Sequence, residues 1–270
     1  MSASERRQIT GFSNPTIKRL KSLREKKHRK REGHFLAEGL RILTEALEAG
    51  KTPKLLVVVE DTDLHPLAQK IEQATFDAGG EVIETSEAII AKLSGKSNPQ
   101  SIIGIYEDHP TPLNELDRGD SGIWLVAQAL RDPGNLGTIL RTGDAVGAGG
   151  LILIDDCVDP FSVEAVRASM GAIFTQNISQ APWDEFIGWL RAGEGQLVGT
   201  SLNTDKDYQS VQYKAPTFLL IGNEAQGLPN EYEGACDTLV KMPMMGKADS
   251  LNAAVASAVM AYEVLNQRRK

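Results

Sequence analysis

Short apolar runs alternate with amphipathic segments along most of the chain, and this alternation constrains the fold more than any other feature of the sequence. The clearest run, IWLVAQAL at residues 123–130, is apolar almost throughout, as expected of a parallel strand buried on both faces. The second half continues the pattern, with expected strands at 151–155, 196–201, 216–222 and 238–243 and expected helices at 135–149, 162–173, 184–193 and 250–269. This order predicts an α/β fold with a parallel sheet, helices on both faces, and ligands beyond the carboxyl ends of the strands.

The first half predicts a smaller α/β unit. Its pattern gives expected helices at 35–50, 64–79 and 86–95 and expected strands at 54–60, 81–85 and 101–107. Residues 109–120, HPTPLNELDRGD, contain two prolines and no periodicity, which is typical of a linker. We therefore expect an N-terminal domain at 1–108 and a C-terminal domain at 121–270.

Charge is distributed unevenly along the chain. The net charge is −7, but residues 1–32 hold eleven Lys or Arg and three Glu, a local charge of +8 that leaves −15 for the rest. A basic segment on an acidic body suits phosphate contact at one end of the molecule, and the alternative is a solvated basic helix that keeps the protein soluble. The candidate RNA contacts in this segment are Lys26, Lys27, Arg29, Lys30 and Arg31.

Several classes of protein are disfavoured. No apolar run approaches the roughly 20 residues of a membrane helix, and the first ten residues lack the apolar core of a secretory signal, so we expect a cytoplasmic protein without a membrane segment. Cys157 and Cys236 lie apart in apolar surroundings and are expected to be free thiols. The four histidines lie outside the second half, so no metal site is expected. Neither GxGxxG after a first strand nor a Walker motif is present.

Three loops of the second half have residue types suited to ligand binding. In the first, RDPGNLGTILR, Asn135 is positioned to cap the following helix, and Arg141 is expected in its first turns, where a guanidinium could clamp a phosphate. A surface arginine on an ordinary capped helix is the favoured alternative from composition alone. The second loop follows an apolar strand and places Gly222, Asn223 and Glu224 at the strand's carboxyl end, although an ordinary turn would explain it as well.

The third loop, residues 240–252, precedes an alanine-rich final helix that Ser250 or Asp249 could cap. Small residues at 253, 254 and 256–258 allow close packing against a partner. Such a helix is either an ordinary core helix or part of a dimer interface.

Together the three loops resemble the signature motifs of the SpoU (TrmH) branch of the SPOUT RNA methyltransferases. The residues that carry the resemblance are Asn135, Gly137 and Arg141 in the first motif, Gly222, Asn223, Glu224 and Gly227 in the second, and Pro243, Met244, Gly246, Ser250, Leu251 and Asn252 in the third. The resemblance covers 121–270 and extends more weakly to the N-terminal half, which is similar to the substrate-binding domain of ribosomal RNA enzymes of this type. Ala253 and Ala254 depart from the Val-Ser that often follows the third motif, which is expected to affect helix packing more than chemistry.

The resemblance implies a deep trefoil knot in the C-terminal domain, a homodimer with a composite site, and S-adenosylmethionine as cofactor. It implies that the cofactor is held near Gly199, Thr200, Ile221, Gly222, Met242 and Leu251. Arg141 is then expected to clamp phosphate and to stabilise the developing alkoxide, with ribose-orienting side chains at Asn135, Glu224, Ser250 and Asn252. The expected reaction is 2′-O-methylation of RNA, with large-subunit ribosomal RNA favoured over transfer RNA. A catalytically silent RNA-binding homologue and a nucleotide-dependent enzyme acting on small molecules are the alternatives.

Overall fold

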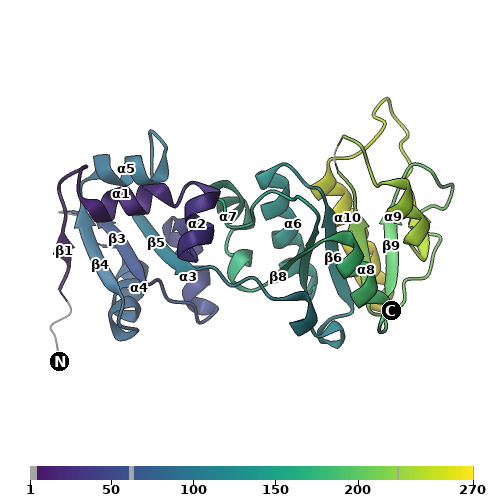
Figure 1. The fold of residues 1–270 in the computed structure, drawn as a ribbon, viewed down its shortest axis with the longest axis horizontal. Helices are drawn as coiled ribbons and strands as arrows, with labels where there is room; N and C mark the ends of the chain where they lie inside the picture. Colours follow the sequence, from purple (N-terminus) through teal and green to yellow (C-terminus); the bar gives the residue numbers. More distant parts are fainter. Residues whose placement is uncertain (1–4, 61–63, 224, 270) are drawn as a thin grey trace. The chain divides into compact units, whose positions relative to one another are not determined.

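The computed structural model describes residues 5–60, 64–223 and 225–269, which form two compact units (Figure 1). The first unit contains the described residues up to Asp108 together with Asp159–Phe174. The second contains His109–Val158 and the described residues from Thr175 onward. Segment 159–174 thus packs with the first unit, although the sequence pattern placed it within the C-terminal domain.

The first unit has one mixed sheet with the strand order β1-β4-β3-β5-β2, in which β1, β4 and β3 are parallel and β5 is antiparallel to β3 and β2. Its elements are β1 (Arg7–Gln8), α1 (Pro15–Ser22), α2 (Lys26–Glu32), β2 (His34–Glu38), α3 (Leu40–Glu48), β3 (Leu55–Val59), α4 (Pro66–Asp77), β4 (Glu81–Thr85), α5 (Glu87–Ser94), β5 (Ile102–Glu107), α7 (Val163–Ser169) and η3 (Ala172–Phe174). The structure confirms two of the expected helices, 64–79 and 86–95, as α4 and α5, and the three expected strands as β3, β4 and β5. Val163 of α7 packs into the same core as Leu20, Leu23 and Val57.

The expected helix at 35–50 is wrong in its first part. Residues Phe35 to Glu38 belong to β2, which pairs with β5, and all four are buried. Gly39, with φ 105°, then separates the strand from α3. The leucine spacing fits a helix, but pairing with β5 decides the outcome because strand propensity depends on tertiary neighbours.

The second unit has a sheet with the strand order β11-β9-β10-β6-β7-β8, in which all strand pairs are parallel. Its elements are η1 (Leu113–Glu115), η2 (Arg118–Asp120), β6 (Ile123–Gln128), α6 (Pro133–Val146), β7 (Gly150–Ile154), β8 (Asn177–Ala181), α8 (Trp183–Arg191), β9 (Gln196–Thr200), β10 (Thr217–Ile221), α9 (Asn230–Ala235), β11 (Thr238–Val240) and α10 (Ala253–Arg268). The predicted parallel α/β fold is confirmed; β8 and α9 were not predicted. The trefoil knot stays a prediction of the family resemblance.

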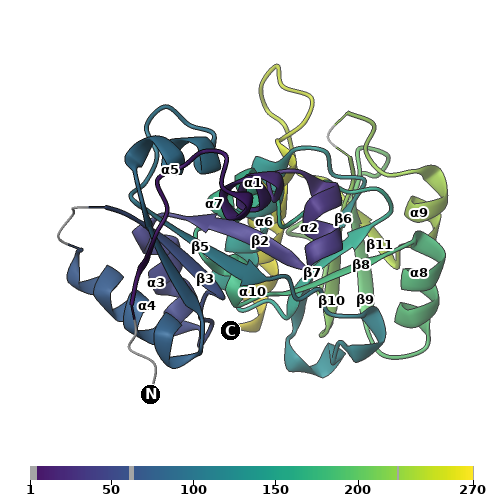
Figure 2. The same cartoon turned by 60° about the vertical axis from the view of Figure 1, so that its left-hand side comes forward.

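Alternation along the strands assigns helices to the two faces of this sheet (Figure 2). Trp124 and Val126 of β6 pack in one cluster with Phe186 of α8. The opposite face carries α6 and α10, which contact each other and β6. Because successive side chains of a strand point to opposite faces, the continuous apolar run of β6 supplies both layers.

Residues 109–120 pack on the second unit. Leu113 and Leu116 are buried in its core cluster. Arg118 lies over the Trp189 ring at 4.2 Å, and its backbone carbonyl accepts a hydrogen bond from Trp124 Nε1 at 3.2 Å. The stretch expected to be a linker therefore contributes to the core. Of the helices that the structure describes, none has both the length and the apolar character needed to cross a membrane.

Candidate functional site

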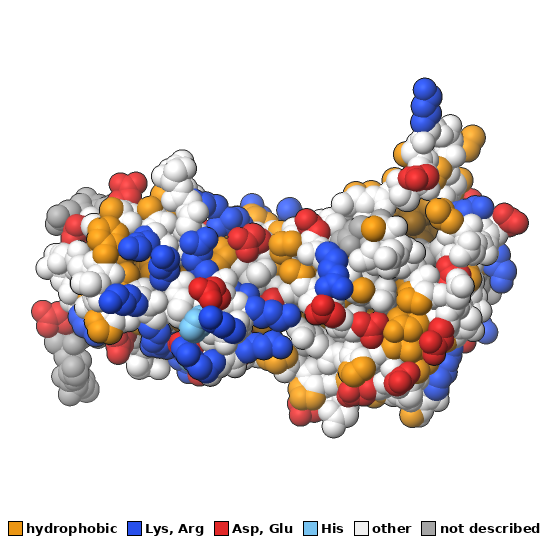
Figure 3. All heavy atoms as spheres, turned by 45° about the horizontal axis from the view of Figure 1, so that its top comes forward, with side chains coloured by type: hydrophobic (Ala, Val, Ile, Leu, Met, Phe, Trp, Pro, Cys, Tyr) orange, Lys and Arg blue, Asp and Glu red, His pale blue; other side chains and the backbone are white. Residues whose placement is uncertain are grey.

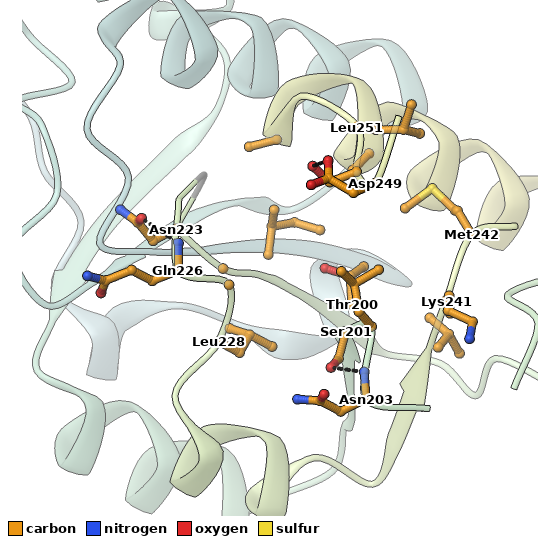
Figure 4. A pocket seen from close by; sticks show the side chains of 18 of the residues that line it. Thr200, Ser201, Asn203, Asn223, Gln226, Leu228, Lys241, Met242, Asp249 and Leu251 are labelled. Carbon is orange, nitrogen blue, oxygen red and sulfur yellow. Dashed lines mark hydrogen bonds between the residues drawn. The ribbon is translucent and has the colours of Figure 1, made fainter. Parts of the chain in front are cut away.

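Loops that follow β9, β10 and β11 surround a cavity of about 400 Å³ in the second unit (Figure 4). We call it the first cavity. It is lined by Thr200 after β9, Ile221 and Gly222 after β10, Met242 after β11, and Leu251 before α10. These are five of the six residues that the resemblance implies for the cofactor. The sixth, Gly199, directly precedes Thr200 on β9.

Two glycines allow the backbone to pack closely at this cavity. A Cβ on Gly222 would lie 2.5 Å from the carbonyl carbon of Gly227 and 2.6 Å from the nitrogen of Leu228. A Cβ on Gly199 would lie 2.7 Å from the sulfur of Cys236. Because backbone atoms cannot move aside cheaply, Gly222 lets the backbone of Gly227 and Leu228 pack directly against the end of β10.

The walls of the first cavity combine apolar and polar side chains. Leu202, Leu228, Val240 and Met242 supply apolar surface. The polar side chains come from Thr200, Ser201, Asn203, Lys241 and Asp249. Such a lining suits a ligand that carries both a flat apolar ring and polar groups.

The first and third motifs meet at one hydrogen bond. Asn252 Nδ2 donates to Asn135 Oδ1 at 2.9 Å, which joins the start of α10 to the first turn of α6. Asn252 Oδ1 also accepts from the backbone nitrogens of Ala254 and Val255, so Asn252 caps α10. The expected caps were wrong here: neither Ser250 nor Asp249 caps this helix, and Asp132 rather than Asn135 caps α6.

The other expected catalytic residues are placed differently. Ser250 lines the first cavity, and its hydroxyl donates to Asp249 Oδ1 at 3.1 Å. Arg141 is exposed on α6, six residues after Asn135. In an α-helix this spacing corresponds to about 9 Å along the helix axis and a rotation of about 240° around it. Arg141 therefore lies beyond the first turns expected from sequence, and it is absent from the residues that line the first cavity. Glu224 lies outside the described residues.

A polar network at the carboxyl ends of β6 and β7 was missed by sequence reasoning. Asp155 accepts hydrogen bonds from Gln128 Nε2 at 3.2 Å and from the Tyr232 hydroxyl at 2.8 Å. Tyr232 stacks on Trp183 with ring centroids 3.8 Å apart. Burial raises the pKa of Tyr232, and the bond to Asp155 raises it further, so the phenol stays protonated as a donor. The only signal in the sequence was that Asp155 ends an expected strand.

The basic segment divides into exposed and buried side chains. Lys26, Lys27, Lys30 and Arg31 are exposed, and Figure 3 shows Lys and Arg side chains gathered on the side of the first unit that carries α1 and α2. Arg29 is only 4% exposed and cannot contact RNA in this structure. Its guanidinium binds Asp159 Oδ2 through Nε at 3.0 Å and Nη2 at 2.7 Å, and the Leu23 carbonyl through Nη1 at 2.8 Å. Its inclusion among the RNA contacts was therefore wrong.

Burial suppresses the ionisation of both cysteine thiols. Burial raises the pKa of Cys157 to about 11 and that of Cys236 to about 12, so both thiols are protonated near neutral pH. Across the described ranges, no three or more His, Cys, Asp or Glu side chains are grouped so that they could hold a metal ion.

Comparison with known proteins gives matches along both units. Residues 122–262 match the model of the SpoU rRNA Methylase family, and residues 14–104 match an MRM3-like substrate binding domain. A 23S rRNA (uridine(2479)-2′-O)-methyltransferase of Streptomyces viridochromogenes is 32% identical over 89% of this chain and 85% of its own length. The 23S rRNA (guanosine(2553)-2′-O)-methyltransferase RlmP of Bacillus subtilis is 28% identical over 96% and 99%.

Solved structures agree with these matches. The structure of an AdoMet-bound rRNA methyltransferase from Sinorhizobium meliloti is 39% identical, has a TM-score of 0.89, and covers 97% of both chains. The SpoU methyltransferase AviRb of Streptomyces viridochromogenes is 30% identical with a TM-score of 0.86, covering 95% of this chain and 98% of its own. Both similarities include the two units.

Proposed function

The chain belongs to the SpoU rRNA methylase family, and on that premise we propose that it methylates a ribose 2′-hydroxyl of large-subunit ribosomal RNA. It is an RNA 2′-O-ribose methyltransferase that uses S-adenosylmethionine. The observation that carries the proposal is that the second and third motif loops line the first cavity, while the Asn135–Asn252 hydrogen bond joins the first motif to the third. Relatives that match almost the whole chain act on 23S rRNA, which supports ribosomal over transfer RNA.

The first cavity fits the cofactor. Its volume of about 400 Å³ lies within the range of small-molecule sites, roughly 300–1,000 Å³. Leu228 and Val240 would give the cofactor apolar contacts, and Thr200 and Asn203 would give it hydrogen-bonding partners. When bound, S-adenosylmethionine supplies a methyl group activated by its sulfonium.

The side chains of this chain position the acceptor. The 2′-hydroxyl would have to lie in line with the methyl group that the cofactor supplies, and its proton would pass to a base of this chain. We assign the orientation of the ribose to Asn135 and Asn252, whose mutual hydrogen bond and helix cap fix their side chains, so that alignment supplies much of the acceleration. Arg141 is not the base, because a guanidinium is not deprotonated in proteins. Glu224 is the candidate proton acceptor.

We further propose that Arg141 acts in the first cavity of a second copy of the chain. Exposed apolar side chains on α10, Val255 at 48% and Tyr262 at 46%, lie seven residues apart and so on one helix face. That exposed apolar face supports burial in a homodimer. Because Arg141 is exposed and lies away from its own chain's cavity, a partner is the natural recipient.

Mixed dimers test the composite site. Arg141→Ala alone should abolish transfer while cofactor affinity stays close to wild type. Mixing Arg141→Ala in equal amounts with Gly222→Val, which lacks the cofactor cavity, should restore roughly a quarter of wild-type activity, since half of the dimers would contain one complete site of two. No recovery in dimers shown to be mixed would place Arg141 in the site of its own chain.

We assign RNA capture to the first unit and location to the cytoplasm, where ribosomal RNA is found in bacteria. The exposed cations of α2 support the first assignment, since each neutralised phosphate adds affinity that falls with salt. The match of residues 14–104 to a substrate binding domain also supports it.

The whole proposal is tested by methyl transfer from labelled S-adenosylmethionine to total RNA from a strain lacking this protein, with the product mapped by mass spectrometry. A single new 2′-O-methylribose in 23S rRNA is the expected result. If the modified nucleotide lay in transfer RNA instead, transfer RNA would be the substrate. Cofactor binding without transfer to free RNA or to assembled subunits would identify a catalytically silent RNA-binding homologue.

A further inference from the structure

A second cavity of about 480 Å³ lies beside the first cavity in the second unit. Residues that line it include Gln128, Ala129, Arg131, Asn223, Gln226 and Asn230. The two cavities share Asn223 and residues 226–228, and we call these residues their common wall. In Figure 4 the side chains of Asn223 and Gln226 point away from Thr200, Met242 and Leu251, that is, away from the centre of the first cavity.

The common wall is held in place by hydrogen bonds. Asn223 Nδ2 donates to the Ala129 carbonyl at 2.8 Å, which ties the loop after β10 to the end of β6. Asn223 Oδ1 accepts from the backbone nitrogens of Ala225 and Gln226. A site built in this way is largely preformed, so that little conformational entropy is lost when a ligand binds.

One lining residue of the second cavity, Gln128, is held by a network around Asp155. Asp155 holds the amide of Gln128 and is itself held by Tyr232. Ala129 and Asp155 have φ values of 48° and 61°, in a region that residues other than glycine rarely adopt. Such backbone strain is retained where surrounding contacts impose it, and it is concentrated at functional sites.

The chemistry of this lining suits a nucleobase. Gln128, Gln226 and Asn230 carry planar amides, which donate and accept hydrogen bonds on one edge and match the donor–acceptor pattern of a base edge. Arg131 forms an ion pair with Asp156 in which the side chains are 61% and 78% exposed, and an exposed pair of this kind exchanges readily for a phosphate. The volume also lies within the range of ligand sites.

We propose that the second cavity holds the base of the nucleotide whose ribose is methylated, with the common wall separating that base from the cofactor. The inference rests on the proposed function and adds the location of the acceptor base. Direct hydrogen bonding by Gln128, Gln226 and Asn230 then makes the second cavity a determinant of which base is accepted.

Two cavity-filling variants test the placement. Asn230 lines the second cavity but not the first, and Asn203 lines the first cavity but not the second. Asn230→Trp should keep wild-type affinity for S-adenosylmethionine, measured by calorimetry, and lower single-turnover transfer to the wild-type enzyme's RNA at least about tenfold. Asn203→Trp should lose cofactor binding and transfer together. Wild-type transfer by Asn230→Trp, or its loss of cofactor affinity, would overturn the proposal.

Base preference tests the specificity. RNA fragments that carry each of the four bases at the mapped position are compared for wild type, Gln128→Leu and Gln226→Ala. The ratio of kcat/KM between the preferred base and the other bases should fall by about tenfold, since in the wild-type enzyme a wrong base leaves these amides without matching hydrogen-bond partners. Unchanged ratios in both variants would overturn the inference. If the wild-type enzyme itself transferred no methyl group to RNA, the proposed function would fail instead.

Discussion

The buried ion pair between Arg29 and Asp159 should dominate the local stability of the first unit. Their side chains are 5% and 11% exposed. Asp159→Ala would remove two charge-assisted hydrogen bonds and leave a guanidinium that cannot lose its charge with only the Leu23 carbonyl as partner. Breaking such a pair costs about 3–5 kcal/mol, a large part of the roughly 5–15 kcal/mol that stabilises a domain.

Arg29→Met should cost less than Asp159→Ala. Methionine retains much of the apolar stem, and Asp159 keeps its bond from the Phe161 nitrogen at 2.9 Å together with some contact with water. In the double variant Arg29→Met/Asp159→Ala no buried charge remains unpaired, so it should be more stable than Asp159→Ala alone. This order distinguishes an ion pair from simple loss of packing.

Urea denaturation followed by circular dichroism measures these differences, and hydrogen exchange of peptides spanning 20–32 and 159–170 locates them. Arg31→Ala is the matched control, because the Arg31 side chain is 66% exposed and its loss should leave stability within about 0.5 kcal/mol. A cost below about 1 kcal/mol for Asp159→Ala, or a double variant no more stable than that single variant, would refute the reasoning.

Three further predictions address the cofactor loop, the basic segment and acid stability. Gly222→Ala should lower cofactor affinity at least about tenfold in calorimetry, because the added Cβ would clash with backbone atoms. Gly246→Ala is the control, because a Cβ there has no neighbouring atom within 4 Å, and it should bind the cofactor normally. Equal affinities of the two variants would contradict this reasoning. Replacing Lys26, Lys27, Lys30 and Arg31 by Gln should reduce the slope of log K for RNA binding against log salt concentration by about 3, if each side chain contacts a phosphate. Exchanging Lys for Arg and Arg for Lys at the same positions keeps the charge and should leave the slope unchanged. Burial raises the pKa of Glu38, but hydrogen bonds from Gln100, Arg167 and Ser94 outweigh it and hold that pKa below 4.5. The stabilisation that ionised Glu38 contributes is therefore complete above pH 4.5 and is lost at lower pH. The urea midpoint of Glu38→Gln should lie below that of the wild type near neutral pH and converge on it in acid. A difference in midpoint that stays constant with pH would argue against this.

Sequence patterns predicted the second unit well because a buried parallel strand has a distinctive composition. The run at 123–130 could hardly form another element, and the glycines and asparagines at strand ends indicated the loops that surround the first cavity. The strand at Phe35–Glu38 failed because its leucine spacing also fits a helix, and only pairing with β5 selects the strand. Long-range pairing of this kind leaves no trace in a local window.

Burial of individual charges was equally hidden from the sequence. Arg29 stands among exposed cations of the same type, and Asp159, its partner, is 130 residues away. Nothing in KKHRKRE distinguishes the buried arginine, because a helix turns one face inward every third or fourth residue and cations occupy most positions of this one. The capping residue of α10 was ambiguous for a related reason, because Asp249, Ser250 and Asn252 are all good caps and the hydrogen bond to Asn135 favours the last.

Strand order explains why motifs nearly a hundred residues apart form one site. β6 and β10 are neighbours and parallel, so the loops after them leave the same edge of the sheet, and Asn223 reaches the Ala129 carbonyl. β9 and β11 extend that edge, and the packing of α10 on α6 brings Asn252 to Asn135. The strands thus set which loops meet, while the loop side chains set what binds. Substitutions in the wall shared by the two cavities should therefore alter cofactor and base recognition together, whereas substitutions on one side should alter only one.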